Sequence, residues 1–136
     1  LQDISPLKAL TKLKHLELFA SDDRRKALSD IAPLAGLRLE TLNIGHSQVT
    51  DLSPLAGMPI SSLNIGDTPV ADLSPLANSR LSRLFCGYTK ISDLRPLLTC
   101  KKMTLIEGNK NAFDPASVAE LQQAVPNCII NWDGKK

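Results

Sequence analysis

The sequence Asp-Leu-Ser-Pro-Leu at residues 51–55 recurs along the chain in five closely related copies. The other copies keep its aspartate, its proline and its final leucine, and they read DISPL at 3–7, DIAPL at 30–34, DLSPL at 72–76 and DLRPL at 93–97. The last four aspartates are 21 residues apart three times running, and the first lies 27 residues before the second. A fixed period of this size indicates a solenoid of stacked structural repeats.

Residues 51–71 show what one repeat encodes. Ser53-Pro54 is typical of a helix start, because serine can supply an N-cap oxygen and proline fits the first helical position. Leu63 and Ile65 then alternate with polar residues, which predicts a short strand with one apolar face. A single unit cannot bury that face alone, so we expect neighbouring units to stack and bury it continuously.

The strand and following turn of each copy resemble the leucine-rich repeat pattern L-x-x-L-x-L-x-x-N-x-L, as in LETLNIGHSQV at 39–49. The asparagine position of the pattern is held in successive copies by Ser47, Thr68, Thr89 and Asn111. The resemblance implies that these side chains hydrogen-bond backbone groups in the turns between coils. It implies an α/β fold, a right-handed solenoid whose curved parallel β-sheet carries short helices or 3-10 turns on its convex side.

The short helical segment of each repeat is similar to a bacterial subtype of leucine-rich repeat. Repeats of this kind, ending in a helix and a strand such as PNCIINW at 126–132, are associated with planctomycete-like bacteria. There they often lie C-terminal to a serine/threonine kinase domain. Because the chain opens on Leu1 rather than methionine, partway into the repeat pattern, we expect it to be part of a longer protein.

The domain organisation follows from where the period holds and where it breaks. Residues 1–113 are expected to form five leucine-rich repeats, and 114–136 a C-terminal capping helix and strand of the same domain. The first repeat carries a charged insertion near 21–28, just after its strand. That insertion is either a solvated surface excursion or a contact loop projecting from one rim.

Composition excludes several classes of function. Of the 136 residues 43% are hydrophobic and 22% charged, and the net charge is +2. This balance is that of a globular domain and argues against a nucleic-acid partner or a membrane surface. We therefore expect a protein partner, no membrane insertion by this segment, and a monomer in its natural context. The compartment stays open, with a slight preference for the cytoplasm.

Cysteine usage is the next constraint. Cys86, Cys100 and Cys128 show no C-x-x-C spacing, which disfavours a zinc site. Cys86 and Cys100 fall on core positions of the repeat, so small buried hydrophobic side chains are the leading interpretation. The alternative is a disulfide between Cys100 and Cys128 on neighbouring coils.

Candidate binding residues come from alternate strand positions, which should line the concave face of the sheet. Most of these positions repeat from coil to coil, and the exceptions are the candidates for partner binding: His15, Glu17, Arg83, Phe85, Tyr88 and Glu107. Arg83, Phe85 and Tyr88 come from one coil, and aromatic and arginine side chains are enriched at binding hot spots. The alternative is random drift at the surface of a repeat.

The repeated aspartates Asp30, Asp51, Asp72 and Asp93 form a row of carboxylates, one per coil. We expect them to hydrogen-bond local backbone amides, with a calcium or acid–base role as the alternative. No catalytic motif is evident, and we expect no enzyme activity, cofactor or metal in this segment. Three functions stay open: a protein-interaction module on the concave face, a regulatory or substrate-recognition region of a larger serine/threonine kinase, and a structural spacer.

Overall fold

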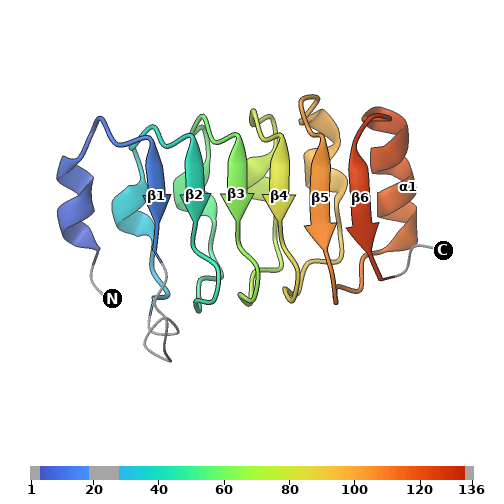
Figure 1. The fold of residues 1–136 in the computed structure, drawn as a ribbon, viewed down its shortest axis with the longest axis horizontal. Coiled ribbons are helices and arrows are strands. Elements are labelled where there is room, and N and C mark those ends of the chain that lie inside the picture. The colour runs from blue at the N-terminus through green and yellow to red at the C-terminus, as the bar shows by residue number, and fades with distance from the viewer. Residues whose placement is uncertain (1–3, 19–27, 134–136) are drawn as a thin grey trace.

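The computed structural model describes residues 4–18 and 28–133, and within these ranges the chain forms a single-sheet solenoid. All strand pairs are parallel, and the strands lie side by side in chain order (Figure 1). The six strands are β1 (His15–Glu17), β2 (Thr41–Asn43), β3 (Ser62–Asn64), β4 (Arg83–Phe85), β5 (Leu105–Gly108) and β6 (Ile129–Trp132).

A second layer of short helices covers one face of this sheet and leaves the other face open (Figure 1). In the described ranges these are the 3-10 helices η1 (Ser5–Ala9), η3 (Ala32–Leu34), η4 (Ser53–Leu55), η5 (Ser74–Leu76) and η6 (Arg95–Thr99), followed by the α-helix α1 (Pro115–Ala124). The predicted leucine-rich repeat solenoid is therefore confirmed. The predicted insertion near 21–28 falls almost wholly outside the described residues.

The register of the sheet follows the sequence period. Leu42 pairs with Leu63, and Leu63 with Leu84, so equivalent positions of successive repeats lie beside one another. These leucines are buried, as are Leu34, Leu55 and Leu76 at the ends of the 3-10 helices. The core is therefore a continuous layer between sheet and helices, and each coil covers the apolar face of its neighbours.

All three cysteines are buried free thiols. The interpretation as small core residues is confirmed, and the alternative disulfide between Cys100 and Cys128 is wrong. Burial raises the pKa of the Cys86 thiol to about 12 and that of Cys128 to about 11. Both groups therefore stay protonated at neutral pH and are poor nucleophiles.

The 3-10 helices begin differently from the expectation. Ser53 is the first residue of η4, and no side chain caps that helix from the N-cap position at Leu52. Instead Asp51 Oδ1 accepts a hydrogen bond from the Ser53 amide at 2.8 Å. The proposed role of serine as N-cap is wrong, because the carboxylate two residues earlier satisfies the amide that opens the helix.

The cap at the C-terminal end is joined to the last repeat by polar contacts on the helical side. Arg95 occupies the position of Ser53 and Ser74, and its guanidinium contacts Asp93 at 3.4 Å, Asp114 at 3.2 Å and the carboxylate of Glu120. The buried Ser117 hydroxyl accepts a hydrogen bond from the Leu94 amide at 3.2 Å. These bonds fix α1 against η6.

Gly108 in β5 makes room for an aromatic ring. It holds the core position that Ile44 and Ile65 hold in earlier coils, and a Cβ built on it would lie 2.3 Å from Phe113 Cζ. Phe113 is buried and packs against Trp132 of β6, with ring centroids 5.8 Å apart. The glycine thus lets Phe113 replace the missing branched side chain at the junction between repeats and cap.

We predict that Gly108→Ala destabilises the domain by about 1–3 kcal/mol, because the added methyl overlaps the Phe113 ring in a packed core. Urea unfolding followed by circular dichroism measures the loss. Gly66→Ala is the matched control, because its Cβ would meet no atom closer than 3.3 Å. Equal stability of Gly108→Ala and the parent chain would contradict this account of the junction.

Candidate functional site on the open face of the sheet

The open face of the sheet, which is the expected concave face, carries two rows of side chains. Paired strand positions give one row through Thr41, Ser62 and Arg83, and a second through Asn43, Asn64 and Phe85. The first two members of each row are small and polar, and the third member breaks the pattern. Of the six candidate residues, Arg83 and Phe85 therefore lie together on β4.

The asparagines of the second row have a structural task. Asn43 Oδ1 accepts a hydrogen bond from the Gly45 amide at 3.0 Å, and Asn64 Oδ1 accepts one from Gly66 at 2.9 Å. Each bond closes the turn that leaves the strand. Phe85 stands at the same position in β4 but has no side-chain acceptor, so this coil lacks the side-chain bond.

Phe85 is half-buried and lines two hollows on the open face. One hollow, of about 210 Å³, is bounded by Phe85 together with Glu17, Thr41 and Asn64. The other, also about 210 Å³, is bounded by Phe85 with Tyr88, Glu107 and turn residues of four neighbouring coils. Among the described residues, Phe85 is the aromatic side chain that lines both hollows.

Tyr88 lies at the rim of the second hollow and is 63% exposed. Its backbone is in the left-handed region, with φ of 61°, and the equivalent turn residues His46, Asp67 and Lys110 have φ of 60°, 55° and 64°. The Tyr88 amide donates to the Asn109 carbonyl of the next coil at 2.9 Å. The turn therefore holds the tyrosine backbone in place although its ring faces solvent.

The other four candidates divide between the hollows and the sheet surface. Glu17 and Glu107 each line a hollow, and Glu107 Oε1 accepts a hydrogen bond from Asn131 Nδ2 at 2.9 Å. His15 and Arg83 are exposed and belong to neither of these two hollows. His15 Nδ1 instead shares a hydrogen bond with Thr41 Oγ1 at 2.8 Å.

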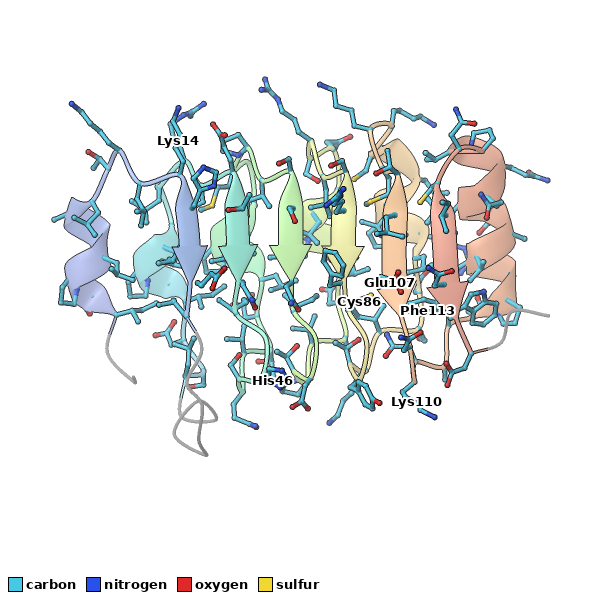
Figure 2. All side chains as sticks on the ribbon, viewed as in Figure 1. Lys14, His46, Cys86, Glu107, Lys110 and Phe113 are labelled. Carbon is cyan, nitrogen blue, oxygen red and sulfur yellow. The ribbon has the colours of Figure 1, made fainter. Side chains whose placement is uncertain are left out.

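One pair beside the second hollow was missed from the sequence. His46 Nδ1 and Asp67 Oδ2 are 2.9 Å apart and join the turns of two neighbouring coils. Figure 2 shows His46 at the edge of the sheet where the strands end. The two residues are 21 positions apart, which is the repeat period. This spacing could have indicated from the sequence that the two side chains lie in adjacent coils.

The row at the asparagine position of the pattern holds the turns together. The hydroxyls of Ser47, Thr68 and Thr89 each donate to the carbonyl three residues earlier, at 2.7, 2.6 and 2.8 Å. Asn111 reaches further: its Nδ2 donates to the Cys86 carbonyl of the preceding coil at 2.9 Å. An amide therefore bridges two coils where a hydroxyl closes only its own turn.

The repeated aspartates precede the helices and are not among the residues that line the two hollows. Each accepts a hydrogen bond from the amide two residues later, at 2.8 Å for Asp30, Asp51 and Asp72 and 2.9 Å for Asp93. The amide and then the hydroxyl of Ser53 lower the pKa of Asp51 from its ordinary 3.8. The hydroxyl and then the amide of Ser74 lower the pKa of Asp72.

Metal-ligand side chains do not cluster in the described ranges. No three His, Cys, Asp or Glu side chains among residues 4–18 and 28–133 lie close enough to hold a metal ion. No helix in the same ranges has the length and apolar character needed to cross a membrane. What the open face offers is a shaped surface with aromatic, acidic and amide groups, which suits binding.

Fold, register and repeat together make this chain a leucine-rich repeat domain. Its structure is similar to internalin C2 of Listeria monocytogenes, with a TM-score of 0.86 and 33% identity over 98% of this chain and 57% of that one. It is similar to internalin F of the same organism, with a TM-score of 0.73 and 31% identity over 96% of this chain and 39% of that one. The chain thus spans about half the length of these proteins or less.

A leucine-rich repeat protein of Leptospira interrogans shares the fold, with a TM-score of 0.57 and 18% identity over 92% of this chain and 38% of that one. These neighbours are bacterial, which agrees with the expected bacterial origin; the planctomycete-like source and the kinase context stay predictions. No protein-family model matches the sequence, and no curated protein matches it either.

The aspartate row predicts how stability depends on pH. Because the folded-state pKa values of Asp51 and Asp72 are depressed, both carboxylates stabilise the fold above their unfolded-state pKa. That contribution is lost as the pH falls through the folded-state values, which lie below about 4. Asp51→Asn/Asp72→Asn keeps the accepting oxygens but does not titrate there. We expect this variant to lose less stability than the parent on acidification, measured by urea unfolding at a series of pH values. Identical pH profiles would contradict the assignment.

Proposed function

We propose that this domain is a non-catalytic protein-interaction module whose partner binds the open face of the sheet around Phe85. The leucine-rich repeat neighbours support protein binding in general, and the geometry of the open face supports this location. The module presents a rigid sheet, and a few side chains that depart from the repeat supply the binding energy.

The main support for this proposal is that residue 85 is a phenylalanine, whereas the equivalent residues of the two preceding repeats are asparagines. The repeat's own residue at this position closes the following turn, as Asn43 and Asn64 do. Phe85 cannot accept that hydrogen bond from the turn amide, and part of its aromatic ring is exposed to solvent. A residue that costs the fold a bond and is not needed in the core has its use outside the fold.

The surroundings of Phe85 match a binding hot spot. Such sites combine an aromatic anchor with nearby polar groups that exclude water once the partner is bound. Here Tyr88 stands beside one hollow and Glu17 beside the other, with Phe85 between them. A partner side chain can enter on either side of the ring.

Two narrower or competing functions remain distinct from this proposal. A kinase catalytic domain in the same polypeptide would make the module a regulatory or substrate-recognition region, an idea that rests on sequence resemblance alone. A structural spacer would bind nothing on the open face and would tolerate replacement of Phe85 by any residue that preserves the fold.

The test is to replace Phe85 by the residue that the repeat itself prefers. Phe85→Asn restores an acceptor for the Gly87 amide, so we expect the fold to be retained with equal or higher stability in urea. Partner binding should weaken about tenfold or more, as removal of a hot-spot side chain does. Phe85→Ser should also weaken binding. The partner is first captured from source-cell lysate, and its affinity is then measured with purified proteins.

Leu10→Ser is the matched control, because it removes a side chain that is 47% exposed and lies outside the sheet. We expect this variant to bind like the parent chain. Undiminished affinity of both Phe85 variants, or failure of the intact domain to retain any protein, would refute the proposed site.

A further inference from the structure

Charge is distributed unevenly between the two edges of the sheet. The turns that lead from each helix into the next strand are residues 10–14, 35–40, 56–61, 77–82, 100–104 and 125–128. Their charged residues are Lys12, Lys14, Arg38, Arg80, Lys101 and Lys102, with Glu40 as the single acid. We call these six cations the basic rim.

The turns at the opposite edge, which lead from strand to helix, have the reverse sign. In the described part of those turns the acids are Asp30, Asp51, Asp67, Asp72, Asp93 and Asp114, against the two cations Lys90 and Lys110. Figure 2 shows Lys14 at one edge and Lys110 at the other. The small net charge of +2 therefore conceals a strongly basic edge and an acidic one.

The basic rim is also hollowed. A hollow of about 430 Å³ is bounded by Lys12, Lys14, Arg38 and Arg80, and a second of about 270 Å³ by Arg80 and Lys102. Both hollows share Arg80, Glu40 and Pro59, so they form one continuous groove across the coils. A groove lined mainly by one sign of charge concentrates ligands of the opposite sign.

Most of the rim cations are available to a ligand. All six are exposed. Lys14 lies 3.8 Å from Glu40, an exposed pair of little stabilising value. Lys101 Nζ donates to the Ala124 carbonyl near the end of α1 and so has a structural contact. Arg38, Arg80 and Lys102 line the groove without a salt bridge in the described structure.

Hydroxyl groups along the same edge supply hydrogen-bond acceptors. Ser61 Oγ donates to the Glu40 carbonyl at 3.2 Å, Ser82 Oγ to the Ser61 carbonyl at 3.1 Å, and Thr104 Oγ1 to the Ser82 carbonyl at 2.9 Å. Each hydroxyl proton is thus directed to the preceding coil, and the oxygen lone pairs remain for a ligand. A ligand that satisfies both groups needs anionic groups for the cations and N–H donors for the hydroxyl oxygens.

We propose that the basic rim docks an extended acidic polypeptide segment of a partner protein. Carboxylates of such a segment face the lysines and arginines, and its backbone amides donate to the serine hydroxyls. Four strand spacings separate the Lys14 and Lys102 coils, roughly 19 Å, which about six residues of extended chain would cover. Among the described residues, the groove lining contains no aromatic side chain on which nucleic-acid bases could stack.

This surface is separate from the site around Phe85, and the two proposals stand independently. The probe is a fluorescein-labelled deca-glutamate peptide, and binding is followed by fluorescence anisotropy at low ionic strength. We expect saturable binding that weakens as salt is added. Arg38→Glu/Arg80→Glu should reduce the affinity about tenfold or more, whereas Phe85→Asn should leave it unchanged.

The matched control reverses the same number of charges at the other edge. Lys90→Glu/Lys110→Glu should change the affinity by no more than about twofold, because its effect is limited to long-range charge. Circular dichroism verifies that both double variants are folded. Equal loss in the two double variants, or no binding of the peptide to the parent chain, would overturn the proposal. Tighter binding of a labelled sulfated oligosaccharide or oligothymidylate than of deca-glutamate would overturn the assignment to polypeptide.

Discussion

The structure depends on the burial of one apolar row per coil by the rows on either side of it. A repeat contributes a strand of three or four residues and a 3-10 helix of three to five, too little to form a core alone. Leu63 of β3 is fully buried because Leu42 and Leu84 pair beside it and the helical layer closes over it. Every other feature of the chain either maintains this stacking or lies outside it.

Residues that maintain the stacking of coils repeat along the sequence, and residues outside it do not have to. Side chains that serve stacking recur at the period of 21, including the aspartates that begin the helices and the hydroxyl groups that close the turns. Exposed side chains that make no such backbone bond contribute little to stacking and are free to differ. The proposed binding residues are of this kind: Phe85 lies on the open face, and Arg38 and Arg80 lie on the basic rim. They can therefore change without altering the residues that stack the coils.

The period made the fold and the strand register predictable, because equivalent residues of stacked coils must align. The predicted strands and the junction with the final helix lie close to their observed positions, and the candidate residues Phe85, Tyr88 and Glu107 line one hollow. Local chemistry was less predictable. Asp51 accepts the Ser53 amide at the helix start, whereas Ser53 was expected to act as the N-cap itself. The basic rim emerges only when turns far apart in sequence align along one edge.

The stacking account requires that the last coil and the repeats unfold together, because Phe113, Ser117 and Arg95 join the cap to the core. Trp132, the single tryptophan, reports on β6, whereas far-UV circular dichroism reports on the whole chain. The most direct test is urea unfolding followed by both signals in the same samples. If the core is continuous, the Trp132 fluorescence and circular dichroism transitions coincide and have one midpoint. A Trp132 transition at clearly lower urea, with most of the circular dichroism signal retained, would contradict a continuous core.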